Sequence, residues 1–220
     1  MEPLRIHSVT SQTSDTFETA SEAAISAIRS GELIVFPTDT VYGVAADAFS
    51  APAVQRLLDA KGRSRAMPPP VMIYDASVLD ALTIEVPRWA REMVGDLWPG
   101  ALTLICRAQP SLTWDLGETK GTVAVRVPQH EQLRELLKAT GPLAVSSANS
   151  TGQAAAKSAA EAQEMLGESV AVYLEGDEPG TGVASTILDI TSAEPQVVRL
   201  GGVSLEELHR FNNTIEMSAG

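Results

Sequence analysis

The apolar residues follow two spacings along the chain, and these predict helices that alternate with strands. Apolar positions three and four residues apart, bounded by caps or glycines, predict helices at 17–30, 51–61, 76–82, 88–97, 130–139, 158–166 and 204–211. Short apolar or alternating runs predict strands at 33–36, 71–74, 101–106, 122–127, 143–145, 170–174, 185–190 and 196–200. This alternation is typical of an α/β fold. Because the connections between 174 and 200 are too short for parallel crossovers, we expect a mixed parallel and antiparallel sheet.

Length and composition favour a single globular domain. The chain has 220 residues, of which 44% are hydrophobic and 20% are charged. We expect one domain over residues 1–210, with flanking helices, and a disordered tail over residues 211–220. The single cysteine, Cys106, lies in an apolar run and fits a core position in a reducing environment. No apolar run approaches the roughly 20 residues of a membrane span, and residues 1–30 lack a secretion signal, so we expect a cytoplasmic protein.

The charge of the chain is strongly negative but unevenly placed. The formal net charge is −12, which argues against tight, nonspecific binding of nucleic acid. Against this background Arg56, Lys61, Arg63 and Arg65 form a basic island in which Asp59 is the only acid. The island indicates either a local anion site or a solvated helix end.

Two short segments have side chains that suit a phosphate. Lys61 and Arg63 flank Gly62, which lets the backbone turn so that both cations converge on one anion. Ser147 and Asn149 end a strand, and the backbone amides that follow could hold phosphate oxygens. A surface pair and a capping turn are the alternatives. Neither a P-loop nor a dinucleotide-binding glycine motif is present in the sequence.

A further strand carries a charge inside apolar sequence. Arg126 lies within the run 123–127 and needs an anionic partner, which could be a ligand carboxylate or an internal Asp or Glu. Arg199 raises the same question. The polar segment 37–43, directly after a predicted strand, is either a pocket wall or a turn. The three histidines are scattered, so we predict no metal site and no Ser-His-Asp triad.

In combination and in this order, several segments resemble the YrdC/TsaC family of threonylcarbamoyl-AMP synthases. They are the Pro-Thr-Asp-Thr-Val-Tyr-Gly, Lys-Gly-Arg, Trp-Pro-Gly-Ala-Leu-Thr, Val-Ala-Val-Arg-Val-Pro, Ser-Ser-Ala-Asn, Ser-Thr and Arg-Leu-Gly segments at 37–43, 61–63, 98–103, 123–128, 146–149, 185–186 and 199–201. The resemblance covers residues 17–205 and implies a YrdC-like fold with a large concave cleft. It also implies the reaction of L-threonine, bicarbonate or CO2, and ATP to give L-threonylcarbamoyladenylate and pyrophosphate.

The resemblance assigns a role to each matching residue. It implies that Lys61 and Arg63 are catalytic and hold the ATP phosphates, so we expect both side chains to be exposed in the cleft. Further nucleotide contacts would come from Thr122, Ser147, Asn149 and Arg199, and threonine contacts from Thr40, Arg126 and Ser185. Magnesium would arrive with ATP rather than occupy a dedicated site. The protein would act by aligning the substrates and neutralising charge at phosphorus, with the loop 108–121 as a candidate lid.

Two departures and two alternatives accompany this interpretation. Met67 and Met72 stand where the family usually has a polar residue and a histidine, and the chain resembles the short, single-domain form. The product would feed a separate transferase complex that makes tRNA N6-threonylcarbamoyladenosine.

One alternative is an RNA-binding module of the same fold, although the net charge leaves room only for weak binding. The other is a carbamoyl-transfer domain, whose larger relatives carry zinc-binding cysteines.

Overall fold

The computed structural model describes residues 6–9, 14–177 and 180–218, and the structural statements below concern these residues. The helices are α1 (Ser14–Arg29), α2 (Ala51–Ala60), α3 (Leu79–Leu82), α4 (Arg88–Leu97), α5 (Glu131–Thr140), α6 (Ala159–Leu166) and α7 (Leu205–His209), with short 3-10 turns η1 (Ala76–Val78) and η2 (Gly167–Ser169). The strands are β1 (Ile6–Val9), β2 (Ile34–Phe36), β3 (Gly43–Asp47), β4 (Val71–Met72), β5 (Thr83–Ile84), β6 (Leu102–Ala108), β7 (Thr122–Arg126), β8 (Leu143–Ser147), β9 (Val172–Gly176), β10 (Thr186–Asp189), β11 (Gln196–Arg199) and β12 (Glu216–Met217).

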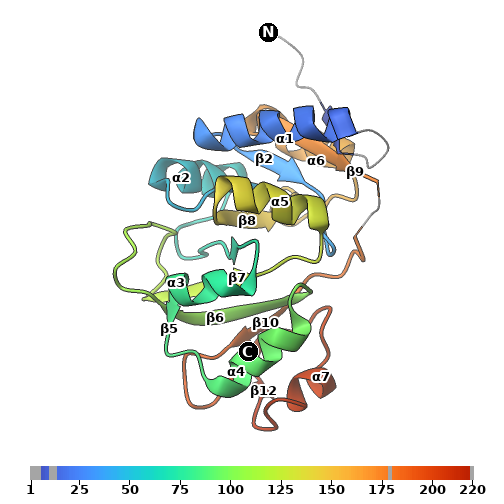
Figure 1. Ribbon diagram of the computed structural model, residues 1–220. Coiled ribbons are helices and arrows are strands. Elements are labelled where there is room, and N and C mark those ends of the chain that lie inside the picture. Colours follow the sequence, from blue (N-terminus) through green and yellow to red (C-terminus); the bar gives the residue numbers. More distant parts are fainter. Residues whose placement is uncertain (1–5, 10–13, 178–179, 219–220) are drawn as a thin grey trace.

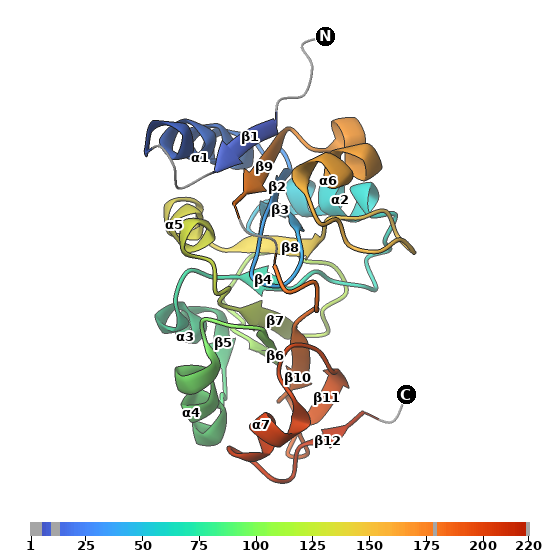
Figure 2. The same cartoon turned by 90° about the vertical axis from the view of Figure 1, so that its right-hand side faces the viewer.

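The strands form one mixed sheet, as the short connections predicted. Their order is β1-β9-β2-β3-β8-β4-β7-β6-β10-β11-β12, and β5 pairs with β6. Parallel pairs such as β4 with β7 and β10 with β6 stand beside antiparallel pairs such as β3 with β8 and β6 with β7. Figure 2 shows the strands following one another from β1 near the top to β12 near the bottom. The α/β class and the mixed sheet are therefore confirmed.

Helices cover both faces of the upper half of the sheet. In Figures 1 and 2, α1 and α5 lie against one face, and α2 and α6 lie against the other. The lower half is accompanied by α3, α4 and α7. Beneath α1 and α5 lies a compact core cluster in which Leu133 and Leu137 of α5 join Phe36, Leu143 and Val145 of the sheet. None of the described helices has the length and apolar character that a membrane crossing requires.

The helix that leads into the basic island has clear boundary signals. Ser50 caps α2, where its Oγ accepts a hydrogen bond from Ala53 N at 3.4 Å, and Pro52 stands in the first turn. At the other end, Gly62 adopts a φ of +59°, which favours glycine. The chain therefore leaves the helix at Lys61 and turns toward Arg63.

Several elements differ from the prediction. The strands β1, β3, β5 and β12 were not predicted; β3 is rich in alanine, and its pairing with β2 and β8 fixes it as a strand. The disordered tail predicted over residues 211–220 is wrong for residues 211–218. Ile215 is 1% exposed, and Gln196 and Val197 of β11 pair with β12. A single buried side chain and a two-residue strand give too little periodicity to be recognised from sequence. Residues 219–220 lie outside the described residues.

Candidate active site

A cavity of about 420 Å³ opens on the sheet face that α1 and α5 cover further up. Met72 and Val145 belong both to the core cluster beneath these helices and to the cavity lining. Residues paired with one another on neighbouring strands extend the floor of the cavity across the sheet. Met72 pairs with Arg126, and Ile187 pairs with both Thr103 and Arg199. The loops that complete the walls contribute Thr38, Thr40, Val41, Tyr42, Arg63, Pro68, Pro70, Asn149, Gln153, Ala155, Gly182, Ala184 and Ser185.

Most of the predicted site residues gather in this cavity. Those that line it are Thr40, Arg63, Arg126, Ser147, Asn149, Ser185 and Arg199. Lys61 and Thr122 do not. The Thr122 hydroxyl donates to Thr119 O at 2.8 Å, so its nucleotide contact remains a prediction. Of the two methionine departures, Met72 is part of the cavity floor, whereas Met67 is 47% exposed and outside the lining.

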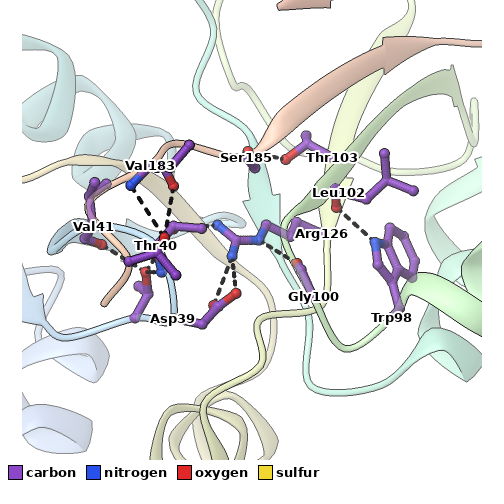
Figure 3. Close-up of polar contacts among 12 residues, drawn as sticks. Asp39, Thr40, Val41, Trp98, Gly100, Leu102, Thr103, Arg126, Val183 and Ser185 are labelled. Carbon is purple, nitrogen blue, oxygen red and sulfur yellow. Dashed lines mark hydrogen bonds and ion pairs between the residues drawn. The ribbon is translucent and has the colours of Figure 1, made fainter. Parts of the chain in front are cut away.

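Arg126 is buried at one end of the cavity and has an internal anionic partner. Its side chain is 4% exposed, and its Nη2 contacts both carboxylate oxygens of Asp39 at 2.7 Å. Its Nε donates to Gly100 O at 2.9 Å, and its Nη1 donates to Thr40 Oγ1 at 2.8 Å (Figure 3). Burial lowers the pKa of Arg126, and the charge of Asp39 opposes that shift. Arginine still remains charged. Among the contacts of the described residues, one Nη1 N–H is left for a ligand.

The hydroxyl of Thr40 has a fixed polarity. Thr38 Oγ1 donates to Val41 O at 2.7 Å, which uses its only hydrogen. The 2.9 Å contact between the two threonine hydroxyls must therefore carry the hydrogen of Thr40. Because Thr40 Oγ1 also accepts from Arg126, its remaining capacity is one lone pair. A ligand group at Thr40 must thus be a hydrogen-bond donor, beside an arginine that prefers an acceptor.

Ser185 and Arg199 form the neighbouring wall. Ser185 Oγ lies 2.8 Å from Thr103 Oγ1, and Ser185 O accepts from Arg199 Nε and Nη2 at 3.1 and 2.8 Å. Partial burial and then the charge of Arg63 lower the pKa of Arg199. Gly201 allows this close packing, since an added Cβ there would lie 2.1 Å from Ala184 O.

Lys61 lies behind the cavity, and the expectation that it would be exposed in the cleft is wrong. It is 2% exposed. Its Nζ donates to Ser147 O at 2.6 Å, to Asn149 Oδ1 at 3.0 Å and to Asn149 O. Burial, followed by the positive charge of Arg63, lowers the pKa of Lys61 to about 8. The side chain therefore holds the turn from Ser147 to Asn149 in this structure, so that the turn and Arg63 present the polar wall.

The side chain of Arg63 is less constrained than that of Lys61. It is half-buried and lines the cavity, and none of the hydrogen bonds or ion pairs of the described residues involves its side chain. On the same cavity lining, the Nδ2 of Asn149 donates to Ser150 O at 2.9 Å and Gln153 O at 2.8 Å, which keeps the turn closed. Arg63 and Arg199 both line the cavity, and the charge of Arg63 lowers the pKa of Arg199, so the two cations are near each other and suit an anion.

Sequence reasoning missed two groups that support the site. Asp39, in the polar segment already singled out, compensates Arg126. Tyr42 OH donates to Glu175 Oε1 at 2.5 Å, and Glu175 Oε2 accepts from Ala159 N at the start of α6. Only tertiary contact reveals these pairs. Among the described residues, no group of three or more His, Cys, Asp or Glu side chains could hold a metal ion.

Comparison with known proteins shows which family the chain is similar to. Residues 26–201 match the family model Sua5/YciO/YrdC, described as "Telomere recombination". The threonylcarbamoyl-AMP synthase of Pyrococcus abyssi is 36% identical over 86% of this chain and 56% of its own, and that of Bacillus subtilis is 35% identical over 90% and 58%. A Mycobacterium tuberculosis protein, provisionally named as the same synthase, is 47% identical over 84% of this chain and 86% of its own.

The solved structures agree. A crystal structure of P. abyssi Sua5 complexed with L-threonine superposes with a TM-score of 0.88 at 32% identity, covering 97% of this chain and 62% of that one. This chain thus spans less than two thirds of the length of Sua5. Escherichia coli YciO has the same fold, with a TM-score of 0.82 at 22% identity over 93% of this chain and 98% of its own. The resemblance seen in the sequence motifs is confirmed: the chain belongs to the Sua5/YciO/YrdC family.

Proposed function

We propose that this protein is an L-threonylcarbamoyladenylate synthase. It would convert L-threonine, bicarbonate or CO2, and ATP to threonylcarbamoyl-AMP and pyrophosphate. The observation that carries the proposal is a single cavity with two differently built ends. One end pairs a buried arginine with an obligate acceptor at Thr40, and the other presents Arg63 beside the Ser147–Asn149 turn. Arg199, bonded to Ser185 and near Arg63, lies between the two ends. The P. abyssi relative bound to L-threonine and the relatives named as synthases support it.

The Arg126 end suits a small α-amino acid. The free Nη1 N–H of Arg126 would receive the carboxylate, and Ser185 lies on the neighbouring wall. Thr40 offers a lone pair, so it would accept from the ammonium or hydroxyl group of threonine. Met72, the apolar neighbour of Arg126 in the sheet register, would contact the aliphatic part of the ligand. A carboxylate, a donor and a small apolar group close together are what L-threonine provides.

The Arg63 end suits the phosphates of Mg·ATP. Arg63 and Arg199 would neutralise the triphosphate, while Ser147 and Asn149 give hydroxyl and backbone groups on the same wall. Lys61 would act by holding that turn, and any direct phosphate contact would require its side chain to leave the carbonyl oxygens of Ser147 and Asn149. The magnesium ion would belong to the nucleotide, as a substrate.

The chemistry requires alignment more than it requires a nucleophile from the protein. The threonine amine attacks the carbon of CO2, forms a C–N bond and releases a proton to give a carbamate. A carbamate oxygen then attacks the α-phosphorus, and the bond to the β-phosphate oxygen breaks with departure of pyrophosphate. Holding both substrates in one cavity supplies proximity, and the arginines stabilise charge that develops on phosphorus and pyrophosphate. The cavity walls would also protect the carbamate from water.

The product would be consumed outside this chain. We expect a separate transferase complex to move the threonylcarbamoyl group onto tRNA adenosine in the cytoplasm. Any contact of this acidic protein with RNA would be weak and strongly salt-dependent.

Pyrophosphate release measured with and without L-threonine and bicarbonate tests the proposal. Release should require both, and it should fall sharply in Arg63→Ala while Arg107→Ala, at an exposed arginine paired with Glu85 outside the cavity lining, behaves like wild type. Release that ignores threonine would contradict the proposal.

A further inference from the structure

The position of Arg63 depends on a backbone segment that has no regular structure of its own. Residues 61–67 follow the end of α2 and consist of turns. Gly62 N and Arg63 N donate to Asp59 O and Leu58 O, both at 2.9 Å, which fixes the start of the segment. Beyond that point only Met67 N, bonded to Ser64 O at 3.1 Å, adds a local backbone contact. Lys61 itself is held by the turn at Ser147 and Asn149, and Thr151 Oγ1 donates to its carbonyl oxygen. The Arg63 side chain has no partner in the described residues, so its position also depends on a contact between residues 64–67 and another part of the chain.

The loop after β6 makes that contact, about fifty residues further along the sequence. Arg65 Nη2 lies 2.5 Å from Asp115 Oδ1, and Glu118 N donates to Arg65 O at 2.8 Å. The same Asp115 oxygen accepts from Gly117 N at 3.1 Å, which holds the loop in the shape that meets Arg65. Both the backbone and the side chain of Arg65 are therefore bound by residues 115–118.

Gly117 makes this contact sterically possible. It has a φ of +105°, and a Cβ added there would lie 2.6 Å from the carbonyl oxygen of Arg65, a backbone atom that cannot rotate away. A second anchor lies beside it, where Trp114 stacks on Phe49 at a centroid distance of 5.4 Å just before α2 begins. Leu116 between these anchors is 2% exposed. The loop is thus packed at several points.

We infer that residues 114–118 are a brace that positions Arg63 in the anion site. Gly117 and Asp115 are positioning residues: no residue of 109–121 lines the cavity, and their effect passes through Arg65 to the adjoining Arg63. The loop therefore supports the cavity wall, in place of the lid for which it was a candidate in the sequence. This inference rests on the proposed function, in which Arg63 binds the ATP phosphates.

The test compares two glycine substitutions in the same loop. Gly117→Ala drives a methyl group into Arg65 O, whereas Gly121→Ala, at a φ of +77°, strains the backbone with no atom within 4 Å of the new Cβ. We expect Gly117→Ala to raise the KM for ATP about tenfold, since small displacements of positioning groups have effects of this order or larger. The Kd for L-threonine measured by calorimetry should stay unchanged in both variants. Equal KM values for ATP in Gly117→Ala and Gly121→Ala would overturn the inference.

A double-mutant cycle separates positioning from general loss of structure. If Gly117 acts through Arg63, Gly117→Ala should add little to the loss of kcat/KM for ATP in an Arg63→Ala background. Additive losses would contradict the brace. If thermal unfolding indicates that Gly117→Ala does not fold, Asp115→Ala replaces it, removes the oxygen that accepts from Arg65 and Gly117 N, and should raise the KM for ATP severalfold without affecting the Kd for L-threonine. A wild-type KM in Asp115→Ala would then overturn the inference. A wild-type protein without threonine-dependent turnover would instead refute the proposed function.

Discussion

Replacing Asp39 with alanine leaves the Arg126 charge without its partner, in a site where water has little access. The Arg126 side chain is 4% exposed and that of Asp39 is 15% exposed, and both Asp39 oxygens lie 2.7 Å from Nη2. In Asp39→Ala the guanidinium keeps its hydrogen bonds to Gly100 and Thr40, which are neutral groups. The variant therefore isolates the contribution of the compensating negative charge.

The size of the effect follows from burial. Removing one partner of a buried ion pair costs about 3–5 kcal/mol, whereas exposed pairs contribute about 0.2–1 kcal/mol. Asp39 retains some exposure and Arg126 borders the cavity, so we expect a loss near the lower end, about 3 kcal/mol in the free energy of unfolding. The double variant Asp39→Ala/Arg126→Met should lose less than the single variant, because no unpaired charge remains.

Urea unfolding of the three proteins, followed by circular dichroism, measures these differences. Repeating it with saturating L-threonine should stabilise Asp39→Ala by more than it stabilises wild type, because the ligand carboxylate would supply the missing anion. A loss below about 1 kcal/mol for Asp39→Ala would place the pair in the exposed class. That result would refute the reasoning from burial.

Three further predictions concern other parts of the cavity. Arg63→Ala should reduce kcat/KM for ATP in the pyrophosphate-release assay by about 100-fold, as expected when a group that stabilises transition-state charge is removed; a reduction under about threefold would count against the phosphate assignment. Lys61 has a folded-state pKa of about 8, below its ordinary value, so burying its charge disfavours folding below that pH. Between about pH 8 and the ordinary pKa of lysine, the unfolded chain binds more protons at Lys61 than the folded protein does. The free energy of unfolding of wild type, measured with urea, should therefore rise with pH relative to that of Lys61→Met. Parallel pH profiles of the two proteins would contradict this. Thr38→Val leaves the O–H and N–H of Thr40 without their acceptor and should weaken L-threonine binding about tenfold in calorimetry. Thr38→Ser keeps the hydroxyl and should bind L-threonine nearly as wild type does. Equal affinities of the two variants would show that the Thr38 hydroxyl does not orient Thr40 for binding.

The local elements were largely predictable, and the sheet order was not. Helices with caps and a clear apolar face, such as α2, and β-branched strands, such as β7, follow from residues close in sequence. The alanine-rich β3 becomes a strand because β2 and β8 pair with it on either side. The position of β9 between β1 and β2 depends on pairing between segments that are far apart in the sequence. Such pairing leaves no periodic signal in any one segment.

The site shows the same division. The order of motifs was enough to gather Thr40, Arg126 and Ser185 into one prediction, and they lie together along the cavity. The burial of Lys61 was missed because it depends on carbonyl oxygens of a turn more than eighty residues away. Arg126 was correctly predicted to require an anion, yet only the fold could choose Asp39 over a ligand. Residue types predicted the chemistry of the site, and tertiary packing decided which partners each charge has.

The proposed function requires that one cavity join threonine, CO2 and the α-phosphate of ATP. The most direct measurement incubates the protein with Mg·ATP, L-threonine and carbon-13 bicarbonate, and identifies the nucleotide product by rapid mass spectrometry. We expect an AMP adduct whose mass includes threonine and one labelled carbonyl carbon, formed together with an equal amount of pyrophosphate. ATP consumption that yields only unlabelled AMP or ADP, at a rate independent of threonine, would contradict it.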